Sequence, residues 1–369
     1  MPEPLKSFFD AARVRRIADE LQAAWPPFPR ASFVAEASAG LEGLELLDRG
    51  RHIARAMAKA LPREDERALE VLLRALGPPL ASATGHGMEA FHHHPHAEAV
   101  VLRGLEHPDL ALAAMREITK RTSCEFAIRP FLERHPATTM ETLRAWVDDP
   151  NEHVRRLVSE GTRPRLPWAP RLRGFQEDPR PVLALLERLK DDPSEYVRRS
   201  VANNLNDIAK DHPDVALATC ARWLEGASRE RTRLVRHALR SLVKAGHPEA
   251  IRLAGGDADA DVRAKVEVEP KRVRIGGKVR VRVTLTNRSS APARVVLALR
   301  VHFVKARGKT SPKTFKLADA RLEPRATTTL SKTLSLAQHS TRTHYAGVHR
   351  LELLVNGAPR RAGEFVLEE

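Results

Sequence analysis

The stretch DPNEHVRR at residues 149–156 returns as DPSEYVRR at residues 192–199, 43 positions further along the chain. A weaker copy, RLVR at residues 233–236, follows 38 positions after the second, and residues 261–263 are a candidate for a truncated last copy. Proline suits the first turn of a helix and pushes the residue before it out of helical geometry. The repeated Asp-Pro pairs therefore predict repeated helix starts.

Apolar residues around these copies recur at spacings of three and four, as in residues 71–76 and 182–189, which is the pattern of amphipathic helices. Paired helices with a period of about 40 residues are typical of HEAT-like repeats. Such pairs stack into a curved solenoid whose concave face can hold an elongated ligand. The alternative is an irregular helical bundle in which the spacing is a coincidence; we interpret the pattern as a solenoid.

The apolar period changes to two in the last third of the chain. Residues 278–286, KVRVRVTLT, alternate as a half-buried strand does, and residues 294–303 and 349–355 indicate further strands. Turn signals such as Asn356-Gly357 separate these segments. Short strands with evenly placed turns over about 100 residues are typical of an immunoglobulin-like β-sandwich.

The expected fold class is therefore multidomain, α then β: a HEAT-like α-helical solenoid over residues 1–263 and an immunoglobulin-like β-sandwich over residues 264–369. The chain carries 62 Lys and Arg against 47 Asp and Glu, a net charge of +15. Residues 264–369 hold 22 of these basic and 8 of these acidic residues, whereas residues 1–263 hold 40 and 39. A basic domain attached to a near-neutral one indicates a module that approaches a polyanion.

Composition excludes several classes of protein. No run of about 18 or more apolar residues occurs, so we expect no membrane-spanning helix. The two cysteines, Cys124 and Cys220, lie in apolar helical patterns, which indicates reduced core residues in a cytoplasmic protein. The run from His92 to His96 resembles a metal cluster, but adjacent histidines point in different directions and no Cys or carboxylate pattern accompanies them. We interpret this run as a loop.

Three segments of the helical region, around Glu125, Glu160 and Asp207, hold polar residues that a solenoid core does not require. Glu125 is flanked by small and apolar residues, on a helix that we expect to stop at Pro130. Glu160 precedes a Gly- and Pro-rich loop that also contains Trp168. Taken alone, Glu125 has a simpler interpretation as a surface ion pair, and Trp168 as a packing residue.

The repeat register makes Glu160 informative when it is compared with Asp207. Glu160 comes six residues after Val154 in one copy, and Asp207 comes ten residues after Val197 in the next. The difference of four residues is about one helical turn, so we expect both carboxylates on the same face of neighbouring parallel helices. Carboxylates that converge in a groove form a plausible reaction centre. The alternative is that residues 203–207, Asn-Asn-Leu-Asn-Asp, are only a polar ladder between turns.

At these segments the chain resembles the AlkC family of bacterial DNA alkylation-repair glycosylases, relatives of AlkD. The motifs that carry the resemblance are residues 87–91, GMEAF; residues 125–131, EFAIRPF; residues 153–168, HVRRLVSEGTRPRLPW; and residues 196–213. The resemblance covers roughly residues 1–260, and some members of the family carry an immunoglobulin-like C-terminal domain.

The resemblance implies a HEAT-like solenoid that holds duplex DNA in its concave groove and hydrolyses the N-glycosidic bond of cationic N3-methylated bases, chiefly 3-methyladenine. It implies that the lesion is approached from the DNA backbone while the base stays largely stacked. The residue roles carried over from the family are as follows: Glu125, Glu160 and Asp207 as active-site carboxylates, Trp168 as the aromatic residue beside the lesion, and Arg156 and Arg163 as backbone clamps.

The chemistry of the reaction agrees with these residue types. An N3-methylated adenine carries a positive charge and leaves without being protonated by an acid. Fixed carboxylates stabilise an oxocarbenium-like sugar and position water, as they do in glycoside hydrolysis. We therefore expect a monofunctional hydrolase that acts on alkylated double-stranded DNA as a monomer, with no metal, nucleotide cofactor or obligate protein partner. The competing hypotheses are a non-catalytic HEAT-like scaffold and a structure-specific DNA-binding protein.

Overall fold

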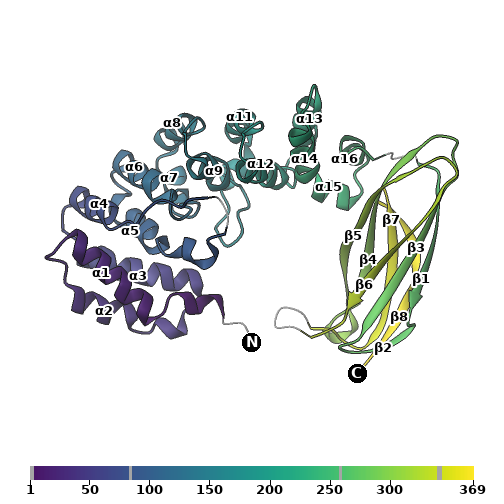
Figure 1. Ribbon diagram of the computed structural model, residues 1–369, viewed down its shortest axis with the longest axis horizontal. Helices are drawn as coiled ribbons and strands as arrows, with labels where there is room; N and C mark the ends of the chain where they lie inside the picture. Colours follow the sequence, from purple (N-terminus) through teal and green to yellow (C-terminus); the bar gives the residue numbers. More distant parts are fainter. Residues whose placement is uncertain (1–3, 83–84, 257–259, 339–342) are drawn as a thin grey trace. The chain divides into compact units, whose positions relative to one another are not determined.

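The computed structural model describes residues 4–82, 85–256, 260–338 and 343–369. The chain divides into two compact units, Met1–Asp211 and His212–Glu369. The first unit contains helices α1 to α12, and the second contains helices α13 to α16 and strands β1 to β8 (Figure 1). Among the described residues, no helix is long and apolar enough to span a bilayer. The fold class predicted from the sequence, helices followed by an immunoglobulin-like all-strand domain, is confirmed.

The helices of the first unit stack in two layers. Helix α4 packs on α6 and α6 on α8 in one layer, while α3 packs on α5 and α9 on α12 in the other. The helices are α1 (Ala11–Ala24), α2 (Arg30–Ser38), α3 (Leu46–Ala60), α4 (Asp65–Arg74), α5 (His94–Gly104), α6 (Pro108–Thr119), α7 (Arg129–Arg134), α8 (Pro136–Trp146), α9 (Glu152–Gly161), α10 (Arg173–Glu177), α11 (Arg180–Leu189) and α12 (Glu195–Ile208). The pairs α8/α9 and α11/α12 are the two sequence repeats.

The repeated motif has a structural reason. The Asp149 carboxylate accepts a hydrogen bond from the backbone N–H of Asn151 at 2.8 Å, and Asp192 accepts one from Ser194 at 2.8 Å. Arg155 donates to the carbonyl oxygen of Asp149 in its own repeat and, through Nε, to the Asp192 carboxylate of the next repeat at 2.6 Å. The first arginine of the motif therefore joins consecutive repeats, which fixes α9 beside α12.

The second unit begins with four helices and continues as two facing sheets. The helices are α13 (Pro213–Leu224), α14 (Arg229–Ala238), α15 (Arg240–Ala245) and α16 (Pro248–Leu253). The strands are β1 (Val262–Glu269), β2 (Arg272–Arg274), β3 (Lys278–Asn287), β4 (Ala293–Val304), β5 (Thr310–Leu322), β6 (Thr327–Ser335), β7 (Gly347–Val355) and β8 (Ala358–Glu368). One sheet has the order β1-β3-β6 and the other has the order β2-β8-β7-β4-β5.

Strand β3 shows why this part of the chain forms a sandwich. Val279, Val281 and Val283 are buried in the core between the sheets, whereas Arg280 and Arg282 alternate with them and are exposed. The alternation is the one that the sequence predicts for a half-buried strand. Strand β1 begins at Val262, so the interpretation of residues 261–263 as a truncated helical repeat is wrong. Helices α13 to α16 lie in the same compact unit as the strands, while the domain limits 1–263 and 264–369 stay a prediction.

The interpretation of the run from His92 to His96 as a loop is also wrong. His94 begins helix α5, with Pro95 in its first turn, and the four histidines of the run are buried. The His92 ring lies 2.7 Å from the Glu20 carboxylate of α1. This partner is distant in sequence, so the burial has no local sequence signal.

Candidate active site

Two of the predicted carboxylates share one guanidinium group. Glu160 lies in the last turn of α9 and Asp207 in the last turn of α12, and these helices pack side by side. Arg163 follows directly after α9; its Nη1 donates to Glu160 Oε1 at 2.7 Å and its Nε donates to Asp207 Oδ2 at 2.8 Å. The structure thus brings together the pair that the repeat register predicts.

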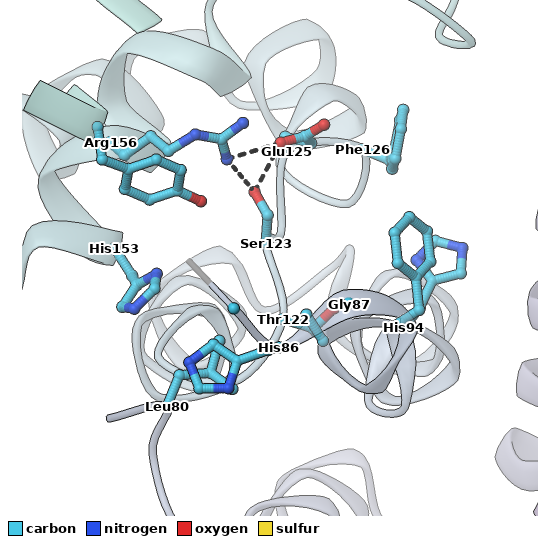
Figure 2. Close-up of a pocket in the computed structure, with 14 residues that line it drawn as sticks. Leu80, His86, Gly87, His94, Thr122, Ser123, Glu125, Phe126, His153 and Arg156 are labelled. Atoms are coloured by element: carbon cyan, nitrogen blue, oxygen red, sulfur yellow. Dashed lines mark hydrogen bonds and ion pairs between the residues drawn. The ribbon is translucent and has the colours of Figure 1, made fainter. Parts of the chain in front are cut away.

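Glu125 is connected to the same pair through Arg156. The Arg156 Nη1 donates to Glu125 Oε2 at 2.9 Å, and the Ser123 hydroxyl donates to the same oxygen at 2.8 Å (Figure 2). The other terminal nitrogen of Arg156 lies 3.6 Å from Glu160 Oε1. We call the five residues Glu125, Arg156, Glu160, Arg163 and Asp207, which alternate in charge, the charge chain.

Glu125 is not on a helix that stops at Pro130, as the sequence predicted. It lies in a turn, and Pro130 is in the first turn of the following helix, α7. Proline has no N–H to donate, which costs nothing at a helix start because the first N–H groups have no partner within the helix. The turn directs the Glu125 carboxylate toward Arg156 instead of along a helix face.

Two carboxylates of the charge chain are buried from solvent. Glu160 is 5% exposed and Asp207 is 1% exposed. Burial opposes the charged form of Glu160, but Arg156, Arg163 and a hydrogen bond from Ser200 outweigh it, so the pKa of Glu160 lies below its ordinary value. Burial likewise opposes the charged form of Arg163, yet the two carboxylates raise its pKa. Glu160 is therefore ionised at neutral pH.

Within the five residues of the charge chain, the carboxylates outnumber the guanidinium groups by one. The three carboxylates face two guanidinium groups. Lys210, at the end of α12, donates to the second oxygen of Asp207 at 2.8 Å, but the Lys210 side chain is 42% exposed and is screened by water. Arg129, on which the charges of Glu125 and Asp207 act, adds a third buried cation beside the chain. The carboxylates are thus held in fixed positions by closely matched positive charge.

A buried arginine that the sequence did not single out holds the loop after α9. Arg129 donates to the carbonyl oxygens of Gly161 at 3.2 Å and Arg163 at 2.9 Å, and to that of Pro170. Burial lowers the pKa of Arg129 to about 10. These bonds fix the backbone of Arg163 relative to α7. The available signal was an arginine inside the otherwise apolar segment 126–132.

Trp168, in the loop that Arg129 holds, does not pack in a core. Its side chain is 66% exposed, and its backbone has a φ of +66°. A left-handed conformation is uncommon for a bulky residue and is found where the surroundings or the function require it. The alternative interpretation of Trp168 as a packing residue is wrong, because the indole faces solvent.

The run of polar residues on α12 divides between two roles. The Asn204 amide is buried and donates to the carbonyl oxygen of Ser159 at 2.8 Å and to the Thr162 hydroxyl at 3.1 Å, which ties α12 to α9. Asn204 thus belongs to a polar ladder between the helices, which was the alternative interpretation of residues 203–207. Asp207, one turn further, belongs to the charge chain.

One end of the charge chain opens into a cavity of about 280 Å³ within the first unit (Figure 2). Glu125 and Arg156 line it, and the Arg156 guanidinium lies 4.7 Å from the centre of the Tyr196 ring. The remaining lining residues are Leu80, Gly85, His86, Gly87, Ala90, Phe91, His94, Thr122, Ser123, Phe126 and His153. Aromatic rings around a carboxylate suit a flat, positively charged group. Glu160, Arg163, Asp207 and Trp168 are not in the lining.

Residues that could ligate a metal do not gather in the parts of the chain that the structure describes. No set of three or more His, Cys, Asp and Glu side chains is placed there to hold a metal ion. Cys124 and Cys220 are buried free thiols, and burial raises the pKa of both; that of Cys220 is about 12.

Two family models match the chain. A model described as DNA alkylation repair enzyme matches residues 83–251, which contain the whole charge chain. A model described as the C-terminal Ig-like domain of the uncharacterised protein YhaZ matches residues 262–369. The second match begins at the first residue of β1.

Two individual proteins resemble the chain over nearly its full length. The uncharacterised protein YhaZ of Bacillus subtilis (strain 168) is 32% identical, over 98% of each chain. Among solved structures, the alkylpurine DNA glycosylase AlkC of Pseudomonas fluorescens, bound to DNA that contains an abasic site analogue, is 35% identical, covers 100% of both chains and has a TM-score of 0.92.

Proposed function

The chain belongs to the AlkC family of DNA alkylation repair enzymes, and from this premise we propose that it is a DNA glycosylase specific for cationic N3-methylated bases, chiefly 3-methyladenine. The observation that supports the proposal most strongly is the charge chain. It holds three carboxylates in fixed positions, two of them nearly inaccessible to solvent. Negative charge held in place before reaction stabilises a developing cation without reorganisation.

The proposed reaction is hydrolysis of the bond between the methylated base and deoxyribose. As that bond breaks, its electron pair goes to the base, which becomes neutral, and the sugar acquires oxocarbenium character. Water then adds to the anomeric carbon and loses a proton. A carboxylate stabilises the cationic sugar and a carboxylate orients the water. Because the base is cationic before it leaves, no general acid has to protonate it.

Each member of the site has a proposed role. Glu125, at the cavity, is the carboxylate that solvent and substrate reach most directly. Glu160 and Asp207 supply the deeper negative charge, and Trp168 is the aromatic residue beside the lesion. Arg156 and Arg163 are proposed to clamp the DNA backbone. Arg163 already uses two of its nitrogens to hold Glu160 and Asp207, so it also positions those carboxylates.

The finer features of substrate engagement are proposals as well. The enzyme approaches the lesion from the DNA backbone and leaves the base largely stacked, and residues 264–369 grip the duplex through their positive charge. It works as a monomer in the bacterial cytoplasm, at the nucleoid when acting. It releases the base by hydrolysis alone, without a lysine nucleophile.

The test is to incubate the full-length protein with methylated duplex DNA and to identify the released bases by chromatography. We expect 3-methyladenine to be the main product. Release of no methylated base, or only of bases that carry no charge while they are bonded to deoxyribose, would contradict the proposal.

Glu152 gives a matched control for Glu160. Both lie on α9, and each accepts a hydrogen bond from a serine of the neighbouring repeat: Ser194 in one case and Ser200 in the other. We expect Glu160→Gln to lower base release by about 100-fold or more, which is the usual cost of removing one preorganised electrostatic group. Glu152→Gln should leave base release within about twofold, because no contact connects it to the charge chain. Equal rates for the two variants would exclude Glu160 from catalysis.

A further inference from the structure

The second unit contains a cavity whose lining includes no residue of the charge chain. It lies between helices α14 and α15 and strands β4, β5 and β7, with a volume of about 450 Å³. Four cationic side chains line it, namely Arg236, Arg240, Lys244 and Lys316. Asp319 is the acidic residue in the lining, and its carboxylate accepts a hydrogen bond from Lys316 at 2.6 Å. The cavity is therefore strongly positive.

Two guanidinium groups, those of the lining residue Arg236 and of Arg294, lie close to Gly255, which directly follows the lining residue Ala254. A Cβ atom built on Gly255 would stand 3.2 Å from Arg294 Nη1 and 3.3 Å from Arg236 Nη2. Both nitrogens thus lie close to a single point. Burial and the neighbouring positive charge of Arg294 lower the pKa of Arg236. Like charges held this close repel each other unless an anion lies between them.

Arg236 also has an unused donor. Its Nε is buried, and the structure gives it no hydrogen-bond partner. A buried donor without an acceptor costs free energy, which adds to the cost of holding Arg236 beside Arg294. A side chain at position 255 would lie close to the terminal nitrogens of both arginines, and the φ of +82° also favours glycine. Glycine therefore lets the two arginines approach the backbone here.

We propose that this cavity binds a phosphate group, with Arg236 and Arg294 as its principal donors. A guanidinium group matches the geometry of phosphate oxygens with two parallel hydrogen bonds. A bound phosphate accepts from the terminal nitrogens of Arg236 and Arg294 and neutralises the repulsion between the two arginines. The phosphate is either a free anion or a group of a nucleic-acid backbone, since both offer the same oxygens. The inference goes beyond the proposed glycosylase activity, and its test does not use that activity.

The test measures the melting temperature of the full-length protein in rising inorganic phosphate, with chloride replaced at constant ionic strength. We expect a saturable rise for the native sequence, because a ligand that binds only the folded state stabilises it. In Arg236→Gln we expect the apparent Kd for phosphate to increase about tenfold or more, as loss of charge-assisted hydrogen bonds predicts. In chloride alone, this variant should melt at or above the native temperature, because the repulsion is relieved. A purely structural arginine would instead lower the melting temperature in both salts.

Arg233 provides the matched control. It is an exposed arginine on α14, the helix that carries Arg236, and Arg233→Gln removes the same charge. We expect this variant to respond to phosphate like the native protein. No phosphate response in the native protein, or an equal response in Arg236→Gln, would overturn the proposal.

A second arm identifies the source of the phosphate by phosphorus NMR. Inorganic phosphate is first bound to the protein, and unmodified duplex DNA is then added. Release of the bound phosphate assigns the site to the DNA backbone. Retention of phosphate on the DNA complex assigns it to a free phosphate or a phosphorylated small molecule. Either result supports the site, provided that Arg236→Gln removes the bound phosphate signal.

Discussion

The charge chain of the first unit and the outer face of strand β3 in the second use the same residue types in opposite ways. In the charge chain, Arg163 is buried and donates to two carboxylates. On β3, Arg280 and Arg282 project to solvent, alternating with buried valines. The arrangement in the first unit holds the charges in fixed positions, whereas the arrangement in the second places them at the surface, where Arg282 lies 3.4 Å from Glu267.

The two arrangements suit different functions: buried, fixed charges suit electrostatic catalysis, and exposed charges suit attraction of a polyanion. Buried charges are expensive to desolvate and repay that cost only when their geometry is exact, which is also the condition for electrostatic catalysis. Exposed charges are screened and contribute little to stability, but they attract a polyanion over a distance. The net charge of +15 therefore describes the second role and not the first.

The largest single-residue effect on stability is expected at Arg163. Arg163→Gln leaves Glu160 and Asp207 buried with fewer partners, and we expect the free energy of unfolding to fall by about 3–5 kcal/mol. Arg282→Gln, on the exposed face of β3, should change it by about 0.5 kcal/mol or less. Thermal unfolding of the two full-length variants measures the contrast. Equal melting temperatures would remove the distinction between the two regions.

The next effect is the acid sensitivity of the buried histidines. Burial lowers the pKa of His93 and of His94 to about 4, and lowers that of His96 well below its ordinary value. Below about pH 6.5 these histidines bind protons in the unfolded chain but stay neutral in the folded unit. The free energy of unfolding therefore declines as the pH falls from 6.5 toward 4. Over that range we expect His93 and His94 each to lower the free energy of unfolding by about 3 kcal/mol.

Melting temperatures of the native protein and of His93→Gln between pH 7 and 4 test this expectation. The variant should lose less stability on acidification than the native protein does. An identical pH dependence would mean that His93 takes up its proton without unfolding.

A smaller effect, on activity alone, is expected at Trp168. If the exposed indole contacts the lesion, Trp168→Ala should lower base release by about tenfold, since stacking of one base on an aromatic residue contributes about 1–3 kcal/mol. The melting temperature should stay unchanged, because the side chain buries little surface. Trp168→Gly adds a control, because glycine adopts the positive φ without strain. A large loss of stability in Trp168→Gly would identify a structural residue instead.

The smallest effect per residue is expected on the exposed face of β3. The triple variant Lys278→Gln, Arg280→Gln, Arg282→Gln should bind duplex DNA with a salt dependence whose logarithmic slope is lower by about 3, close to one for each phosphate that the variant no longer neutralises. Its melting temperature should stay close to the native value. An unchanged slope would show that this face does not meet the DNA.

Local periodicity was sufficient to predict much of the fold. The alternation over residues 278–286 predicted β3, and the 43-residue repeat predicted the pairs α8/α9 and α11/α12. These patterns predict structure well because the burial of each residue depends on its position within a single helix or strand. The step of four residues between repeat copies predicted the meeting of Glu160 and Asp207 for the same reason.

Predictions from local sequence failed where long-range contacts decide the structure. Proline is compatible with both the end and the start of a helix, and local sequence did not show that Pro130 begins α7. The histidines of residues 92–96 are buried because α5 packs on α3 and because Glu20 reaches His92 across 72 positions. Arg129 was missed as a site residue because its acceptors lie about one repeat further along the chain.

The proposed mechanism depends on the buried carboxylates of the charge chain cleaving the glycosidic bond, and one pair of variants isolates their contribution. Asp207 and Asp211 lie one turn apart, and each accepts hydrogen bonds from an arginine of the loop after α9: Arg163 and Arg165, respectively. Asp207→Asn removes a charge from the chain, whereas Asp211→Asn removes a comparable ion pair outside it.

Single-turnover release of 3-methyladenine from methylated duplex DNA should fall by about 100-fold or more in Asp207→Asn. In Asp211→Asn it should stay within about threefold of the native rate, the change expected when a partly exposed ion pair is removed. Both proteins should remain folded by circular dichroism. Native rates in a folded Asp207→Asn variant would contradict the catalytic role of the charge chain.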